Sequence, residues 1–171
     1  SCMNSLETAF PLFNCLFHTH RFMFSQDTID TIYNFCIASK NDTNDELVYN
    51  VCDILIEAEN YFIIREPNVI LNILINRNYR TLITKSIVIF KNKINQNLII
   101  NYIENSNGCE QNEYCPLNIL KALIEVNPSV QINLSKFKLC DHFIDCLKIR
   151  KDLMKPEMIQ YYIDLVLSET C

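Results

Sequence analysis

The sequence predicts an all-α protein whose helices stack in pairs. Apolar residues recur at helical spacing in one segment after another, and the pattern returns about every 35 to 40 residues. The chain contains one Gly in 171 residues, so few positions suit the tight turns of β-hairpins. A fixed period of this kind is typical of helical repeats, in which each unit buries its apolar face against its neighbours. Short polar joints separate the helical segments, at residues 40–45, 76–78, 105–109 and 150–156.

Four helices are predicted in the first half of the chain, at residues 6–18, 27–38, 45–59 and 68–75. Ser25 has the residue type and the position of an N-cap for the second helix. The third helix has the strongest apolar stripe, spaced at three and four residues from Leu47 to Ala58. Pro67 fits the first turn of the fourth helix, where its missing N–H is not needed.

The middle of the chain is predicted as two further helices, at residues 79–92 and 95–106, although β-branched residues are frequent in both. Runs such as Ile87-Val88-Ile89 also fit strands. Neither segment alternates strictly between apolar and polar residues, and hairpin turns are missing from the flanks. These two observations favour helices.

The last third of the chain has the clearest signals for where helices begin and end. Pro116 begins a helix that ends at Val126, before Asn127-Pro128. A short helical turn at residues 130–134, a medium helix at 137–148 and a last helix at 156–168 are predicted to follow.

The segment from Leu120 to Pro128 and the helices after it carry a family resemblance, as does the motif from Glu46 to Val51. A long helix that ends at Asn-Pro, then a very short helix, a medium helix and another long helix resembles armadillo and HEAT-type repeats. The resemblance implies a right-handed superhelix of about four units in one domain, residues 1–171, which we expect to be either a whole array or a piece of one. Its third helices would be residues 45–58, 79–92, 116–126 and 157–168.

In armadillo arrays the third helices line a concave groove, where a ladder of Trp and Asn residues holds an extended peptide. This sequence has no Trp, which argues against a nuclear-localisation receptor of the ordinary kind. The resemblance implies instead a non-enzymatic adaptor that binds a peptide or helix of another protein. Its predicted contact residues are Asp53, Glu57, Lys85, Lys121, Glu125 and Asp164.

Two other classes of binding protein fit parts of the sequence. One is a compact viral helical bundle that binds an amphipathic helix in a hydrophobic groove. Such bundles surround one central hydrophobic helix, and no predicted helix here is apolar all round. The other is a binder of RNA or acidic partners, although the formal net charge of −5 makes nucleic acid an unexpected partner. Its contacts would come from a basic strip in a segment without Asp or Glu: Arg77, Arg80, Lys85, Lys91 and Lys93.

No motif predicts catalysis or a cofactor, because one Gly excludes both the P-loop and the dinucleotide fingerprint. The nine Cys residues are expected to be reduced thiols. His142 and Cys146 lie four residues apart, and with Cys109, Cys115 and Cys140 they have the residue types of a zinc site. Paired Cys-x-x-Cys motifs are missing, so we predict no bound metal.

The N-terminal region is rich in Phe, which predicts ordinary core, a contact with further repeats, or self-association. A secretory leader is not apparent, and no segment approaches the about 20 apolar residues that a membrane span needs. The expected location is therefore the cytoplasm or the nucleus. The Phe residues are Phe10, Phe13, Phe17, Phe22 and Phe24.

Overall fold

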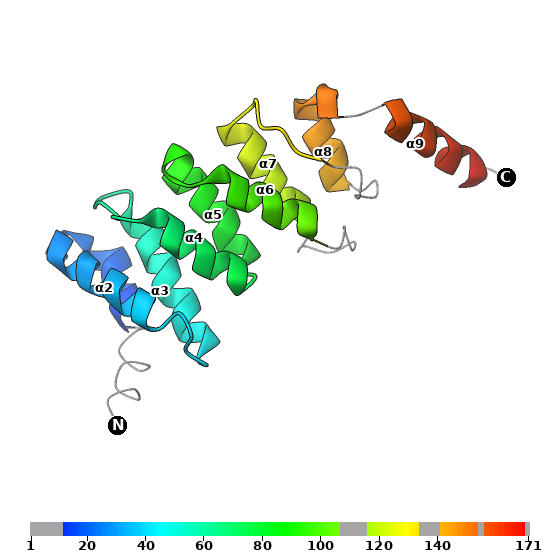
Figure 1. The fold of residues 1–171 in the computed structure, drawn as a ribbon. Helices are drawn as coiled ribbons and strands as arrows, with labels where there is room; N and C mark the ends of the chain where they lie inside the picture. The colour runs from blue at the N-terminus through cyan, green and yellow to red at the C-terminus, as the bar shows by residue number, and fades with distance from the viewer. Residues whose placement is uncertain (1–11, 107–115, 134–140, 154–155, 170–171) are drawn as a thin grey trace. The chain divides into compact units, whose positions relative to one another are not determined.

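The computed structural model describes residues 12–106, 116–133, 141–153 and 156–169, and all regular secondary structure in these ranges is helical (Figure 1). This confirms the all-α prediction, and it confirms helix over strand for the β-branched middle segments. Residues 12–20 form the described part of a first helix. The other elements are η1 (Arg21–Met23), α2 (Gln26–Ala38), α3 (Asp45–Ala58), α4 (Pro67–Asn76), α5 (Arg80–Phe90), η2 (Lys91–Lys93), α6 (Gln96–Asn105), α7 (Pro116–Val126), α8 (Asp141–Ile149), η3 (Lys151–Leu153) and α9 (Pro156–Glu169).

The helix starts follow the predicted signals. The Ser25 side chain accepts a hydrogen bond from the Thr28 N–H and caps α2. Asn44 does the same for α3 by accepting from the Leu47 N–H at 3.0 Å. Pro67 occupies the first turn of α4, as predicted.

The end of α4 shows how a chain with almost no Gly terminates a helix. Asn78 adopts a φ of 57°, the left-handed conformation that Asn tolerates better than most residues. Its N–H donates to the Ile75 carbonyl and the next N–H, of Tyr79, donates to the Leu74 carbonyl. This is the Schellman arrangement, with Asn in the place usually taken by Gly.

The predicted short helix at 130–134 is wrong over its described residues, 130–133, which are not helical. Arg150 explains the difference, because its guanidinium donates to the carbonyls of Pro128 and Val130. The N–H of Asn133 donates to the Glu104 carboxylate at 2.8 Å. Side chains from distant positions therefore bind the backbone groups that a helical turn would use. The medium helix predicted at 137–148 is described only from Asp141, since residues 134–140 lie outside the described ranges.

The chain divides into two compact units, Ser1–Asn95 and Gln96–Cys171. In unit 1, α2 packs on α3 and α4 packs on α5. The pairs also lie side by side, because α3 contacts α5 and α2 contacts α4. α3 is the central helix of this unit, and its side chains Ile54, Leu55 and Ile56 are fully buried. Full burial of an aliphatic side chain stabilises a fold by about 1.5–3 kcal/mol.

In unit 2, α7 is the central helix and contacts both α6 and α8. Its buried side chains include Leu117, Leu120 and Leu123, while Ile99 and Ile103 of α6 and Cys146 of α8 are buried as well. In each unit, one central helix packs against two others.

Candidate functional site

Three of the predicted contact residues meet on the α3–α5 face of unit 1. The Lys85 ammonium of α5 lies 2.6 Å from a carboxylate oxygen of Asp53 and 2.5 Å from one of Glu57, both on α3. The three side chains are 23–29% exposed. Burial lowers the pKa of Lys85, but its bonds to the two carboxylates outweigh this, so the pKa lies above its ordinary value. The cluster joins α3 to α5 and largely satisfies its own charges.

The other three predicted contact residues belong to unit 2. Lys121 and Glu125 lie one turn apart on α7, where Lys121 is half-buried and Glu125 is exposed. Asp164 is exposed on α9 and accepts a hydrogen bond from Gln160 at 2.8 Å. Of the six residues, Asp53, Glu57 and Lys85 form a compact cluster within unit 1.

The basic strip is matched by acidic residues of the preceding helix pair. Arg77 lies 2.9 Å from Asp45, and Lys93 forms an ion pair with Glu59. The partners are 32 residues apart in the first case and 34 in the second. Acidic residues are concentrated between residues 40 and 66, and basic residues between 67 and 103. The ion pairs between these two segments account for this separation of charge.

The remaining cations of the strip differ in their surroundings. Arg80 donates to the side-chain oxygen of Asn78 at 3.2 Å. Lys91 is exposed at the end of α5. Since three of the five predicted cations lie against carboxylates, the strip is a poor counterion for a phosphate backbone.

Asp45 has a second partner in Tyr79, whose hydroxyl donates to its carboxylate at 2.6 Å and whose ring is buried. The hydrogen bond from Tyr79 holds the pKa of Asp45 below its usual range, with help from Arg77. Burial and the neighbouring carboxylate raise the pKa of Tyr79. This contact fixes the start of α3 to the start of α5.

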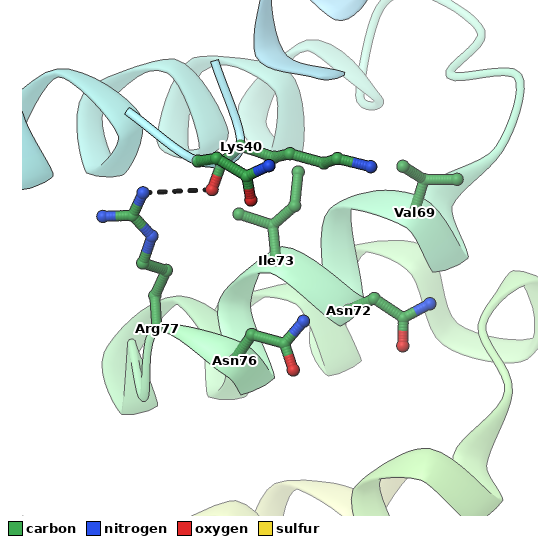
Figure 2. Close-up of a pocket in the computed structure, with 7 residues that line it drawn as sticks. Lys40, Val69, Asn72, Ile73, Asn76 and Arg77 are labelled. Atoms are coloured by element: carbon green, nitrogen blue, oxygen red, sulfur yellow. Dashed lines mark hydrogen bonds between the residues drawn. The ribbon is translucent and has the colours of Figure 1, made fainter. Parts of the chain in front are cut away.

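A cleft with a volume of about 440 Å³ opens between α4 and the joint that connects α2 to α3 (Figure 2). Sequence reasoning missed it, because the two sides of the cleft, residues 40–41 and residues 69–77, are far apart in the chain. Ile73 is buried and with Val69 supplies the apolar part of the lining. The lining residues are Lys40, Asn41, Val69, Asn72, Ile73, Asn76 and Arg77.

Arg77 holds the joint in place along one side of the cleft. Its guanidinium donates to the Lys40 carbonyl at 3.0 Å, the contact dashed in Figure 2, and to the Asp42 carbonyl at 2.5 Å. The Asp42 carboxylate in turn accepts from the N–H of Asn44, the N-cap of α3. The joint is therefore tied to both neighbouring helices through its backbone.

The cleft is lined by polar groups that can form hydrogen bonds. Asn72 and Asn76 are exposed on successive turns of α4, and each amide offers both donors and an acceptor. The exposed Lys40 side chain adds a cation. None of the seven lining residues is a carboxylate, His, Cys or Ser.

The zinc candidate lies mostly beyond the described residues. Cys109, Cys115 and Cys140 fall outside them, as does the side chain of His142. Cys146 is buried and its thiol donates to the Leu117 carbonyl at 3.6 Å. Among the side chains that the structure describes, no group of three or more His, Cys, Asp or Glu residues is arranged to hold a metal ion.

The Phe-rich N-terminal region divides into a packed part and an exposed part. Phe13 and Phe17 each contact Phe24 edge to face, and Phe17 is 2% exposed. Phe22 and Met23 are by contrast 80% and 74% exposed. Phe10 lies outside the described residues. Self-association stays a prediction, and of these described side chains Phe22 is the one placed to take part.

The fold and the cleft together define a protein of antiparallel helix pairs that presents a mixed polar and apolar cleft on unit 1. Comparison with protein-family models, with curated proteins and with solved structures finds no match to the chain. Within the described ranges no helix combines the length and the apolar character needed to cross a membrane.

Proposed function

We propose that this protein is a non-enzymatic interaction module that binds an extended segment of a partner protein in the cleft between α4 and the α2–α3 joint. The observation that carries the proposal is the lining of that cleft, where two exposed amides on α4 and one cation border an apolar floor. Ligand-binding clefts commonly combine an apolar lining with a few polar groups that fix the orientation of the ligand.

The spacing of the two amides fits a peptide backbone. Asn72 and Asn76 are four residues apart on a helix, a rise of about 6 Å. Alternate residues of an extended chain repeat at about 6.6 Å. Each amide can donate to a backbone carbonyl and accept from a backbone N–H, so the pair can hold two alternate residues of the same peptide.

The charges favour an acidic segment. No described residue bonds the Lys40 ammonium, whereas the Arg77 guanidinium is held by Asp45 and by carbonyls of the joint. A carboxylate of the ligand would therefore pair with Lys40. An apolar side chain next to it would contact Val69 and Ile73.

A random library of linear peptides, selected on the full chain, tests the proposal without a known partner. Enriched peptides should combine an acidic with an apolar residue. The variant Lys40→Glu with Asn72→Ala should reduce their affinity at least tenfold, since it reverses one charge and removes one amide. A matched control, Lys121→Glu with Asn118→Ala on α7, should leave the affinity within twofold. A library that yields no peptide, or peptides that bind the cleft variant as well as the unchanged chain, would sink the proposal.

We also propose that the helix pairs belong to a superhelical array of the armadillo or HEAT kind, with α3, α5, α7 and α9 in the place of its third helices. Their first residues, Asp45, Arg80, Pro116 and Pro156, are 35, 36 and 40 residues apart. The pairing of α3 with α5 in unit 1 and of α7 with α8 in unit 2 supports repeated stacking. Small-angle scattering tests this: the array predicts an elongated particle, and a compact sphere contradicts it.

The α3–α5 face is a second candidate surface for the same function, because Asp53, Glu57 and Lys85 are the predicted contact residues that the structure brings together. A partner there would have to replace ion pairs already made within the protein. This cost makes the cleft the better candidate.

A further inference from the structure

Two thiols face each other in the interior of the α2–α3 pair. Cys36 lies in the last turn of α2 and Cys52 in the middle of α3. Their exposed fractions are 1% and 0%, and the sulfur atoms are 3.7 Å apart. At this distance the two sulfurs are in direct contact, with no other atom between them.

We infer that Cys36 and Cys52 are a disulfide-forming pair, which hydrogen peroxide closes and a thiol reductant reopens. The inference does not depend on the proposed binding function. It assigns to these residues a covalent modification site in place of the inert, reduced thiols that the sequence predicts.

Formation of the disulfide requires only a small movement of the two sulfur atoms. A disulfide has a sulfur–sulfur bond of about 2.0 Å, so the two sulfurs must approach by about 1.7 Å from their present 3.7 Å. The helices that carry the thiols are already packed against each other, so their backbones need not change partners.

The chemistry balances with peroxide as the two-electron oxidant. The thiolate of one cysteine attacks a peroxide oxygen, the O–O bond breaks, and the products are a sulfenic acid and, after protonation, one water. The second thiol attacks the sulfenic sulfur, the S–O bond breaks, and a second water leaves with the proton of that thiol. One peroxide is reduced to two waters while two thiols become one disulfide.

Either thiol can react first in this scheme, because the two sulfurs are in contact and either one can donate the hydrogen bond between them. This hydrogen bond favours the thiolate of the cysteine that accepts it, whereas burial raises the pKa of both thiols. The other thiol then stands in contact with the sulfenic acid and resolves it.

The access of peroxide to the two thiols determines the rate of their oxidation but not its product. Both thiols are buried, whereas Cys15 is exposed. Peroxide is close to water in size and reaches the pair through local opening of the helix pair. Oxidation of Cys36 is therefore slower than that of Cys15, but it ends in an intramolecular bond.

The bond would close a loop in which the two cysteines are 16 residues apart. This loop contains the joint between α2 and α3. A cross-link of this length stabilises a fold mainly by restricting the unfolded chain. We expect the oxidised protein to unfold at a higher denaturant concentration than the reduced protein.

Peptide mapping of the unchanged chain is the direct test. The folded protein is treated with peroxide, the remaining thiols are alkylated, and the protein is digested with trypsin. Cleavage after Arg21, Lys40 and Arg65 leaves one cysteine in peptide 22–40 and one in peptide 41–65. We expect these two peptides to be joined, and separated again by reductant. Alkylated Cys36 and Cys52 after complete oxidation of Cys15, or Cys36 joined to any cysteine other than Cys52, would overturn the inference.

A variant that keeps Cys36 and Cys52 as its only cysteines supplies a second readout. Peroxide should raise its denaturant midpoint, and reductant should restore the original value. The same background with Cys52→Ala should show no such change. An oxidised variant with an unchanged or lower midpoint would contradict a bond that fits the native packing. If these variants do not fold, the peptide map of the unchanged chain decides alone.

Discussion

Lys91 ends α5 in a conformation that few residues adopt. Its φ is 51° and its ψ is −119°, away from the common left-handed region, where ψ is positive. The N–H of Lys91 still donates to the Ile87 carbonyl, so the residue caps the helix while the chain turns away. A side chain with a Cβ is strained at such a position, and Gly is not.

Lys91→Gly should therefore stabilise unit 1 by about 1 kcal/mol, because the relief of strain exceeds the entropy that Gly loses on folding. Urea denaturation measures the difference. Asn92→Gly is the matched control: Asn92 is the next exposed residue and its φ is not positive, so the change should cost about 0.5 kcal/mol. Equal effects of the two substitutions would show that Lys91 is not strained.

At the scale of helices, polar contacts at the helix starts and along the facing sides determine how α3 packs against α5. Tyr79 precedes α5 and its hydroxyl reaches both the carbonyl and the carboxylate of Asp45 at the start of α3. Lys85 then joins the two helices farther along. These polar contacts add to the apolar packing and select one register of α5 against α3.

Tyr79→Phe should lower the free energy of unfolding by about 1 kcal/mol at pH 7. A fully buried hydrogen bond to a carboxylate would contribute more, but the Asp45 side chain is 66% exposed. The pKa of Asp45 is lowered in the folded state, so the contribution is complete above the unfolded pKa of about 3.9 and is lost as the pH falls through the folded value. The pKa of Tyr79 is raised, so its contribution is complete below an unfolded pKa of about 10 and is lost as the pH rises beyond it.

Denaturation of the unchanged protein and of the Tyr79→Phe variant at about pH 2.5, 7 and 11 tests this pH dependence, since these values lie on either side of the reference pKa values of Asp and Tyr. The difference between them should be largest at pH 7. A difference that does not change from acid to neutral pH would mean that Asp45 does not accept the bond as a carboxylate.

Lys85→Met should destabilise the protein by about 1–2 kcal/mol, since it leaves two neighbouring carboxylates without their shared cation. Glu57→Gln removes one of them. A double-mutant cycle with Lys85→Met and Glu57→Gln should give a coupling of about 1 kcal/mol. Additive effects would indicate that the ion pair contributes no net stability.

The signals that start helices could be predicted from the sequence, whereas contacts between distant residues could not. Ser25, Pro67 and Pro116 mark helix starts through interactions within one turn, and these predictions are confirmed. The predicted helix after Pro128 is wrong because Arg150, about twenty residues away in the chain, binds its carbonyls. No local pattern contains that information.

At the scale of the whole molecule, the same limit applies to the site. The prediction selected Asp53, Glu57 and Lys85 by their place on helices, and the structure brings these three together as partners of one another. Acidic residues on one helix and basic residues on a later helix were a signal in the charge pattern, because ion pairs between α3 and α5 explain it. The cleft has no such signal, because Lys40 and Asn72 become neighbours only when α4 packs below the α2–α3 joint.

The central claim is that unit 1 binds an extended acidic segment between α4 and the joint. Backbone amide NMR of the full chain, titrated with a peptide selected from the random library, tests it most directly. The account predicts that the perturbed amides cluster at residues 40–41 and 69–77, and that Lys40→Glu weakens binding at least tenfold. Perturbations that centre instead on Asp53, Glu57 and Lys85, or on unit 2, would contradict it.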